Sequence, residues 1–422
     1  MNHLFLLASR MIRPVWPFIP RSIRLLALRG VTRNQTLLDR LDRSLKPPGP
    51  HTPRIIVGMF SSHYSFGKVA RLFESAVSES GAPTYHIDIA PIFPDQATGR
   101  AFKLKFPPQE VLDQPHHLIL VANGFLTAFI LTGLGNSFTR FAFVSSFWAW
   151  ESPVLPAAWG PGFGLSHEII VPSHFTKEAV TRANADAIVR IAPHSVVGSH
   201  LPETDPESML RDPLVVVHFS NLASDVLRKN PLGALALFCE AFEPRTGPTF
   251  RVHLNNPHTD REVVACFERI AKERSDIKLT TGVMSDAELA DWWRGAHIFL
   301  SAHRAEGFGL GLAEAMSAGI CAAGTGWSGN MDFMNEENAI CLPFSLKPRS
   351  YFQRREREEV PYSVDDRWAD ISIGQSAKLL QQANEDRVTL LQKAMRGKRE
   401  IAVRTHADFT KHALHLMTPN GR

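Results

Sequence analysis

Short continuous apolar runs alternate along the chain with longer amphipathic stretches. Runs of Val, Ile and Phe without alternating polar residues are typical of strands buried on both faces of a parallel sheet, and the stretches between them predict helices. The predicted strands are RIIVGMF (54–60), TYHIDI (84–89), HLILVAN (117–123), RFAFVSSF (140–147), EIIV (168–171), LVVVHF (214–219), FRVHL (250–254), IKLT (277–280), HIFLS (297–301) and ICAAG (320–324).

A segment rich in proline and acidic residues, SHLPETDPESMLRDP (199–213), separates these strands into two groups. The alternation predicts an α/β protein with two Rossmann-like doubly wound lobes rather than one large sheet. In such a protein we expect the ligand in an interlobe cleft, at the carboxyl ends of the strands. An exposed loop is expected at 347–367. The predicted regions are an N-terminal extension (1–46), an N-terminal lobe (54–205), a C-terminal lobe (206–380) and C-terminal helices (381–422).

The composition excludes several classes of protein. The chain has 422 residues, 44% hydrophobic and 21% charged, which fits folded domains and excludes general disorder. Its four cysteines form no CxxC pair, which excludes a zinc ribbon and indicates a reducing compartment. A formal net charge of +4 is too small to indicate a nucleic-acid partner, and no apolar run approaches the roughly 20 residues of a membrane-spanning helix. We therefore expect a cytoplasmic protein.

Positive charge is concentrated in residues 1–46. Nine Lys and Arg residues face two acidic residues there, a local net charge of +7, and Leu4, Trp16 and Phe18 lie among them. Basic residues interleaved with large apolar ones predict contact with an anionic membrane surface, at the inner face of the plasma membrane. The alternative is a basic extension that is solvated or packs on the rest of the protein.

Two carboxylates stand out in the segment 297–334. HIFLS predicts a strand, AHRAEGFG a turn with glycine, and LGLAEAMSAG a helix. Glu306 ends the turn, and Glu314 is the only charged residue between Gly307 and Met331. A carboxylate accepts two hydrogen bonds and so suits the vicinal hydroxyls of a sugar or ribose. A glycosidase acid/base pair is the competing interpretation, since spacing in sequence does not measure the separation of the carboxyl groups.

Glycines in this turn favour a bound phosphate nearby. Gly307 and Gly309 flank Phe308, and Leu310 opens the predicted helix, so the backbone can approach a ligand and the helix start offers free amides. Phosphate near the helix start and hydroxyls near the carboxylates together indicate a sugar nucleotide.

The segment RKNP predicts a second anion site. Asn230 is a good N-cap and Pro231 suits the first helical position, which puts Arg228 and Lys229 directly before a helix N-terminus. Two cations there can hold a diphosphate without a metal. The alternative is a pair of solvated cations before a capped helix.

Signals in the N-terminal lobe are weaker. Gly67 lies near the start of a predicted helix after the first strand, where it either approaches donor phosphates or only forms the turn. Trp148, Trp150 and Glu151 form a cluster whose aromatic faces suit a sugar, although core packing is expected for at least one tryptophan.

Several of these segments together resemble one family. EGFGLGLAEAMSAG (306–319) closely resembles the E-x7-E signature of retaining, family-four-type glycosyltransferases with the GT-B architecture. Weaker resemblances to a bacterial subgroup lie in TGWSGNMDFM (325–334), FWAWESPVLPAAW (147–159), EIIVPSHFTKEAV (168–180), RKNPLGALALFCEAF (228–242) and RWADIS (367–372). Many relatives carry a Gly-Arg pair some six residues before the lysine of RKNP, where this chain has Asn221-Leu222-Ala223.

The resemblance implies a hexosyltransferase that moves a sugar from a nucleotide-sugar donor to an acceptor hydroxyl with retention, in surface or exopolysaccharide synthesis. It implies a glycan or polyprenyl-linked glycan acceptor on the N-terminal lobe, where Trp150 and Glu151 would lie. Glu306, Lys229 and Arg228 would be catalytic. The donor-binding residues would be Glu314, Gly307, Phe308, Gly309, Leu310 and Gly67.

No cofactor is expected. The chain has no Asp-x-Asp tripeptide, which argues against a metal-dependent glycosyltransferase, and no HExxH spacing. Two alternative functions remain: a GT-B sugar-nucleotide epimerase or phosphorylase, and an inactive protein that only binds a sugar nucleotide.

Overall fold

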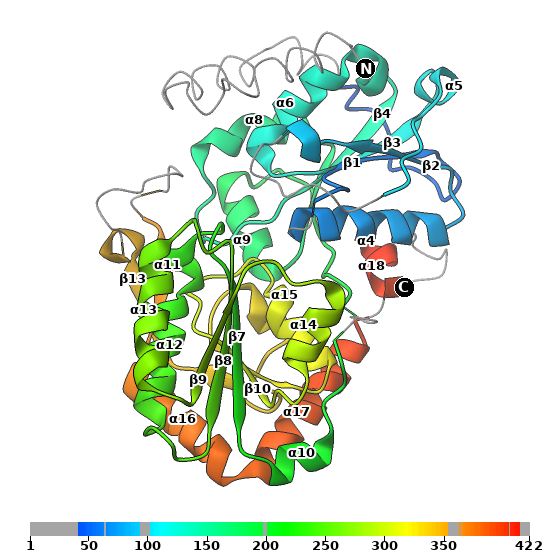
Figure 1. The fold of residues 1–422 in the computed structure, drawn as a ribbon. Helices are drawn as coiled ribbons and strands as arrows, with labels where there is room; N and C mark the ends of the chain where they lie inside the picture. Colours follow the sequence, from blue (N-terminus) through cyan, green and yellow to red (C-terminus); the bar gives the residue numbers. More distant parts are fainter. Residues whose placement is uncertain are drawn as a thin grey trace. The chain divides into compact units, whose positions relative to one another are not determined.

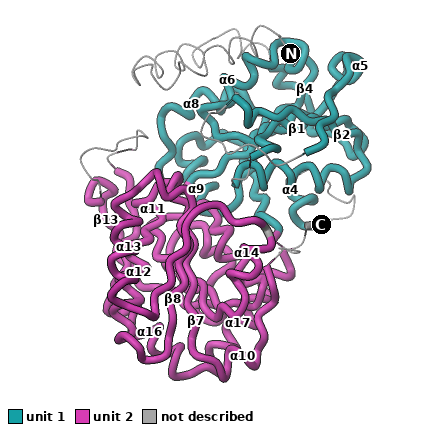
Figure 2. Tube along the Cα trace, viewed as in Figure 1, with its two compact units in different colours: residues 1–150, 154–195, 406–422 teal, residues 151–153, 196–405 magenta. Residues whose placement is uncertain are grey.

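The computed structural model describes residues 41–62, 65–92, 102–196, 201–352, 363, 365–404 and 406–413. The chain forms two compact units, coloured separately in Figure 2. Unit 1 comprises residues 1–150, 154–195 and 406–422, and unit 2 comprises residues 151–153 and 196–405. The short segment Glu151–Pro153 thus belongs to unit 2 although its sequence neighbours on both sides belong to unit 1.

Unit 1 is built on a parallel sheet of six strands in the order β2-β1-β3-β4-β5-β6. The strands are β1 (Arg54–Gly58), β2 (Thr84–Asp88), β3 (His116–Val121), β4 (Ala142–Phe147), β5 (Glu168–Val171) and β6 (Val189–Ile191). Its helices are α4 (Ser65–Glu79), η2 (Ala90–Ile92), α5 (Gln109–Leu112), α6 (Gly124–Leu134), α7 (Asn136–Thr139), η3 (Ala157–Trp159), α8 (Gly160–Gly164), α9 (His174–Ala183) and α18 (His406–Ala413).

Both faces of this sheet are covered. Every residue of β1, β3, β4 and β5 is buried, as the continuous apolar runs predict. Helix α4 packs on one face beside α18, where the rings of Phe73 and Phe409 lie 5.0 Å apart (Figure 1). Helix α6 contributes its apolar residues to the core on the other face.

The start of the described chain also packs on unit 1. Leu41 is buried in its core, and Arg43 Nη1 donates a hydrogen bond of 2.7 Å to the carbonyl oxygen of Ser166. Residues 1–40 of the predicted membrane-binding extension (1–46) lie outside the described residues.

Unit 2 holds a second parallel six-stranded sheet, in the order β12-β11-β10-β7-β8-β9, and a separate antiparallel pair. Its strands are β7 (Val215–Asn221), β8 (Thr249–Asn255), β9 (Ile277–Thr281), β10 (Ile298–Ser301), β11 (Cys321–Thr325), β12 (Ile340–Leu342), β13 (Phe344–Pro348) and β14 (Arg367–Ile371). Its helices are α10 (Pro206–Arg211), α11 (Val226–Lys229), α12 (Pro231–Ala241), α13 (Arg261–Glu273), α14 (Asp286–Trp293), α15 (Leu310–Ser317), η4 (Gly329–Asp332), η5 (Arg349–Phe352), α16 (Ile373–Glu385) and α17 (Arg387–Ala402).

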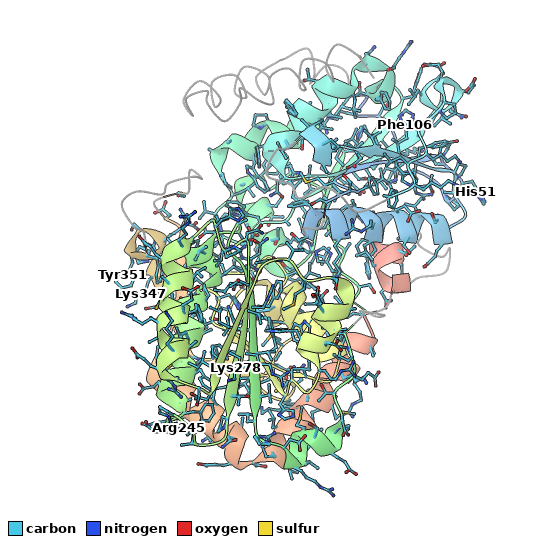
Figure 3. All side chains as sticks on the ribbon, viewed as in Figure 1. His51, Phe106, Arg245, Lys278, Lys347 and Tyr351 are labelled. Atoms are coloured by element: carbon cyan, nitrogen blue, oxygen red, sulfur yellow. The ribbon has the colours of Figure 1, made fainter. Side chains whose placement is uncertain are left out.

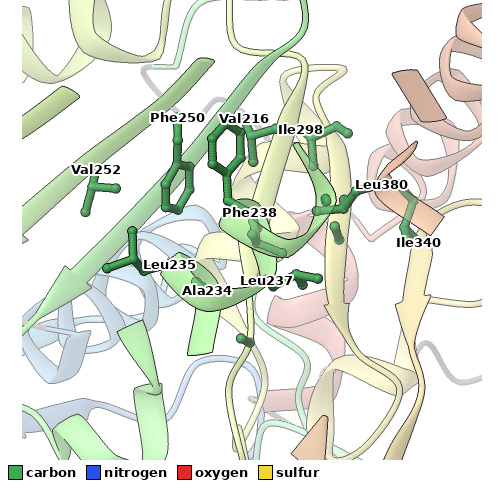
Figure 4. Close-up of a cluster of buried hydrophobic side chains, with 14 of the residues drawn as sticks. Val216, Ala234, Leu235, Leu237, Phe238, Phe250, Val252, Ile298, Ile340 and Leu380 are labelled. Carbon is green, nitrogen blue, oxygen red and sulfur yellow. The ribbon is translucent and has the colours of Figure 1, made fainter. Parts of the chain in front are cut away.

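The core of unit 2 also lies on both faces of its sheet. On one face, Phe238 of α12 stacks on Phe250 of β8 with ring centroids 4.8 Å apart (Figure 4). On the other face, the side chains of α14 and α15 pack around Phe299 of β10.

These elements confirm the predicted fold class and each of the ten predicted strands. The regional boundaries differ from the prediction in two ways. The units change at residues 195–196, and the helices after residue 380 form no separate region within the described chain: α16 and α17 complete unit 2, whereas α18 packs on α4 of unit 1.

The predicted exposed loop at 347–367 is partly wrong. Its ends form strands β13 and β14, and Asp366 is fully buried. Within the loop, Tyr351 is exposed beside Lys347 (Figure 3).

Candidate active site

The candidate residues of unit 2 lie at the point of its sheet where successive strands begin to be added on the opposite side. Counted from β7, the strands lie in the order 3-2-1-4-5-6, so the change falls between the first strand, β7, and the fourth, β10. Ligands of doubly wound folds bind outside the carboxyl ends of the strands at this position. Arg228 and Lys229 follow β7, and Glu306 follows β10, which brings the two predicted motifs together.

The turn that carries the two cations is held by Asn230. This residue adopts a left-handed conformation with φ of 51° and caps α12, its Oδ1 accepting a hydrogen bond from the backbone amide of Gly233. Its Nδ2 donates to the carbonyl oxygen of Ala302, just after β10, at 2.8 Å. The predicted N-cap and the predicted proline at the first helical position are both confirmed.

Glu306 is the centre of the charged cluster. Lys229 Nζ donates to its Oε1 at 2.6 Å, and Arg228 Nη1 lies 3.3 Å from its Oε2. Burial alone would raise the pKa of Glu306, but Lys229 and Arg228 lower it to about 2. Glu306 is therefore a carboxylate at neutral pH, and both of its oxygens face cations.

Arg228 and Lys229 differ in their surroundings. The Arg228 side chain is 9% exposed, and its Nη1 also donates to the carbonyl oxygen of Ala305 at 2.8 Å. The Lys229 side chain is 29% exposed. Arg228 is thus enclosed by protein, while Lys229 remains accessible to a ligand.

The backbone of Glu306 is fixed by the segment 328–330, which lies in TGWSGNMDFM. The amide of Glu306 donates to Ser328 Oγ at 2.8 Å, and its carbonyl oxygen accepts from the amide of Gly329 at 2.9 Å. A Cβ on Gly329 would lie 2.2 Å from the carbonyl oxygen of Gly307, so this close approach requires glycine.

A buried polar network supports that segment. Asn330 Nδ2 donates to the carbonyl oxygen of Thr325, which leaves its Oδ1 to accept from His303 Nε2 at 3.0 Å. His303 Nδ1 accepts from the hydroxyl of Ser301. Burial lowers the pKa of His303, so its imidazole is neutral and this arrangement persists at neutral pH.

Sequence reasoning missed Arg304. Its amide donates to the carbonyl oxygen of Arg228 at 2.7 Å, and its guanidinium donates to that of Leu227. Its Cζ lies 4.3 Å from the ring centroid of Phe352, and burial lowers its pKa to about 10. Arg304 therefore joins the turn after β10 to α11. A single arginine inside HRAEG offers no pattern from which this contact could be predicted.

The predicted donor-binding residues lie at the start of α15. Gly309 is its N-cap in a left-handed conformation, with φ of 95°, and has no side chain to occupy the amides that follow it, beginning with Leu310. Phe308 points into the core and packs against Phe333 with ring centroids 5.1 Å apart, so only its backbone can face a ligand. Glu314 lies further along α15 and is half-buried.

The candidates of unit 1 have clear packing roles. A Cβ on Gly67 would lie 2.4 Å from the carbonyl oxygen of Ser62, so close packing at the start of α4 explains this glycine. Trp148 is fully buried, and its ring lies edge-on to Trp159, which confirms the expectation of a core tryptophan. Trp150 is also buried and donates to the carbonyl oxygen of Val154, so its predicted contact with an acceptor stays a prediction.

Glu151 lies in unit 2, beside the charged cluster. Its Oε1 is 3.4 Å from Arg228 Nη2.

The described part of the chain contains no group of three or more His, Cys, Asp and Glu side chains placed to hold a metal ion. Among the same residues, no helix is both long and apolar enough to cross a membrane.

Comparisons with known proteins agree with this architecture. Residues 227–350, which include the charged cluster, match the model of the family described as glycosyl transferases group 1. A comparison with curated proteins finds no significant match.

Several solved structures share the fold at low sequence identity. The Anabaena protein HepE in complex with UDP and glucose has a TM-score of 0.57 at 12% identity, over 87% of this chain and 100% of that one. Sucrose-phosphate synthase from Thermosynechococcus elongatus has a TM-score of 0.58 at 14% identity, over 86% and 98% of the two chains. The pneumococcal O-GlcNAc transferase GtfA, in complex with UDP and GlcNAc, has a TM-score of 0.50 at 16% identity, over 72% of this chain and 57% of that one.

The structural neighbours and the two doubly wound units define a GT-B fold. The match over residues 227–350 places a segment similar to glycosyl transferases group 1 in unit 2, and together with the fold it supports a glycosyltransferase.

Proposed function

We propose that the protein transfers a sugar from a nucleotide-sugar donor to an acceptor hydroxyl. The observation that carries this proposal is the ion-paired cluster of Lys229, Glu306 and Arg228 at the carboxyl ends of β7 and β10. HepE and GtfA are each known in complex with UDP and a sugar, which supports a UDP-sugar as the donor of this chain.

The cluster suits the departure of a nucleoside diphosphate. Negative charge grows on the diphosphate as the glycosidic bond breaks, and preorganised cations and amides stabilise such charge most strongly. Lys229 is the accessible cation, and the amides at the start of α15 follow a glycine cap. The N-terminus of α12 contributes less, because the Asn230 side chain already occupies the amide of Gly233.

The carboxylates would hold the hydroxyls of the donor. Glu306 lies next to the diphosphate cations, so we assign it to the transferred sugar, and we assign Glu314, further along α15, to the ribose. The resemblance to family-four-type enzymes supports retention of anomeric configuration and a role in bacterial surface or exopolysaccharide synthesis. It also supports a glycan or polyprenyl-linked glycan as the acceptor.

Kinetics of three variants test these assignments. Lys229→Ala should mainly lower kcat, because its contact strengthens as the diphosphate leaves. Glu314→Ala should chiefly raise the KM for donor, and Glu306→Ala should impair both. Charge-assisted hydrogen bonds are worth about 1.5–3 kcal/mol, so each defect should be roughly 10- to 150-fold. Lys278→Ala is the matched control, since Lys278 is exposed on β9 (Figure 3).

Product analysis separates the proposal from its alternatives. A panel of nucleotide-sugars is first screened by thermal shift; a ligand at 100 times its Kd adds roughly 2.7 kcal/mol of stability. NMR of the product then reports a new glycosidic bond and its anomeric configuration. Epimerised donor, phosphorolysis or binding without turnover would each contradict glycosyl transfer, and an inverted anomer would contradict retention alone.

We further propose that transfer needs no metal ion, because Lys229 and Arg228 supply positive charge at the site. Activity should survive EDTA. Loss of activity in EDTA that magnesium or manganese restores would contradict this part of the proposal.

A further inference from the structure

Four charged side chains in unit 2 form one alternating chain. Lys229 Nζ lies 2.6 Å from Glu306 Oε1, Arg228 Nη1 lies 3.3 Å from Glu306 Oε2, and Arg228 Nη2 lies 3.4 Å from Glu151 Oε1. The order is cation, carboxylate, cation, carboxylate. Glu151 ends this chain and comes from the segment that follows β4, far in sequence from the other three residues.

The segment that carries Glu151 is anchored in unit 2. Ser152 is buried and accepts a hydrogen bond of 3.2 Å from Trp368 Nε1. Trp368 is fully buried in β14, and the guanidinium of Arg349 lies 4.7 Å from its ring centroid. The position of Glu151 next to Arg228 is therefore maintained by the packing of its neighbour, not by the ion pair alone.

Glu151 determines how the Arg228 guanidinium is shared. Arg228 presents its nitrogens in a rigid planar fork that matches a carboxylate in a bidentate manner. In this structure one arm serves Glu306 and the Ala305 carbonyl, and the other arm serves Glu151. If Glu151 lost its charge, electrostatic attraction would favour both terminal nitrogens of Arg228 pairing with Glu306. That pairing would draw the Glu306 carboxylate away from Lys229.

We infer that Glu151 is a positioning residue of the donor site, acting through Arg228 on Glu306. This inference rests on the proposed function and deepens it, because it moves Glu151 from the acceptor side, where the sequence places it, to the donor side. The Glu151 side chain is 33% exposed, so solvent screens part of the interaction.

The test compares Glu151→Gln with Glu243→Gln, an exposed glutamate of unit 2, in the full-length protein. Donor hydrolysis without acceptor and UDP affinity by calorimetry report the donor site alone. We expect Glu151→Gln to slow both hydrolysis and transfer by about 2- to 5-fold and to weaken UDP binding, with an unchanged KM for acceptor. Glu151→Asp, which keeps the charge, should recover part of the loss, and Glu243→Gln should behave as wild type.

A second background tests the route through Arg228. Arg228→Lys keeps the positive charge but lacks the fork that reaches two carboxylates. In that background Glu151→Gln should have almost no further effect, since the two substitutions break the same connection. An equal loss in both backgrounds would overturn the inference.

Two other outcomes are separable. Normal donor hydrolysis with a raised acceptor KM would return Glu151 to the acceptor side and overturn the inference while leaving the proposed function intact. A wild-type protein that binds and hydrolyses no nucleotide-sugar would refute the proposed function itself, and the inference with it.

Discussion

The charge of Glu306 is stabilised by two cations, and the stability of the protein depends on this balance. Glu306→Gln would leave the enclosed Arg228 without its nearer carboxylate. Removing one partner of a buried ion pair costs about 3–5 kcal/mol. We expect a clear loss of unfolding free energy at pH 7 in urea titrations, on top of the loss of activity. Glu243→Gln makes the same change of charge at an exposed position and should leave the midpoint unmoved.

The ion pairs of Glu306 also predict that the protein loses stability in acid. The pKa of Glu306 falls from 4.5 to about 2 on folding, so its ionised form stabilises the protein above pH 4.5. That contribution is lost as the pH falls towards 2. The difference in stability between wild type and Glu306→Gln should therefore shrink between pH 4.5 and 2; a constant difference over this range would argue against the ion pairs.

Asp366 contributes to the pH dependence of stability in the opposite direction. Burial raises its pKa from 3.8 to about 6, and the nearby Ser152 hydroxyl and the guanidinium groups of Arg349 and Arg367 offset only part of this effect. The folded protein thus holds the proton more tightly than the unfolded chain, so stability falls as the pH rises from about 4 to 6. In Asp366→Asn, the decrease in unfolding free energy over this pH range should be smaller than in wild type by about 1–3 kcal/mol. Parallel stability curves for the two proteins between pH 4 and 7 would refute this prediction.

The residues that could be predicted from the sequence are those marked by the pattern of their own segment. Glu306 and Glu314 stand out in an apolar segment, and Asn230-Pro231 has the pattern of a helix start. Glu151 and Arg304 gain their roles only from contacts with Arg228 and Leu227, which lie 77 residues away in each case.

At the scale of elements, the turn after β10 and η4 depend on one close contact. Gly329→Ala would place a Cβ 2.2 Å from the Gly307 carbonyl oxygen, against the backbone of Glu306 and Gly307. Such overpacking typically costs about 1–3 kcal/mol and would displace the Ser328 hydroxyl that holds the Glu306 amide. We expect lower stability in thermal unfolding and strongly reduced donor binding.

Gly374→Ala in α16 is the matched control for that variant. A Cβ there meets nothing within 4 Å, and alanine favours a helix by up to about 1 kcal/mol over glycine. Equal melting temperatures for the two variants would show that the contact at Gly329 is relaxed without cost.

The strands that sequence reasoning located are those with long apolar runs. β6 and β12 have only three residues each, too few for a recognisable pattern, and the pair β13–β14 joins segments on either side of the expected loop. Helix α18 carries Phe409 and Ala413 into the core of unit 1, a pairing with α4 across more than 300 residues that no local pattern indicates.

At the scale of the whole molecule, charge is distributed unequally along the chain. The formal net charge is +4, yet residues 1–40 alone carry seven arginines and one aspartate, a net charge of +6. Each Lys or Arg near an anionic bilayer contributes about 1 kcal/mol, so several acting together give reversible binding. We propose on this basis that the N-terminal segment holds the enzyme at an anionic membrane, where a lipid-linked acceptor would lie.

The structure refines how this proposal is tested. Leu41 and Arg43 belong to the packing of unit 1, so a deletion should end at residue 40 and keep them. The full-length protein should sediment with liposomes that contain anionic lipid, and binding should weaken with added salt because screening reduces the attraction. The protein lacking residues 1–40 should stay in the supernatant while keeping the donor affinity of wild type. Undiminished sedimentation of that truncated protein would place the membrane contact elsewhere on the chain.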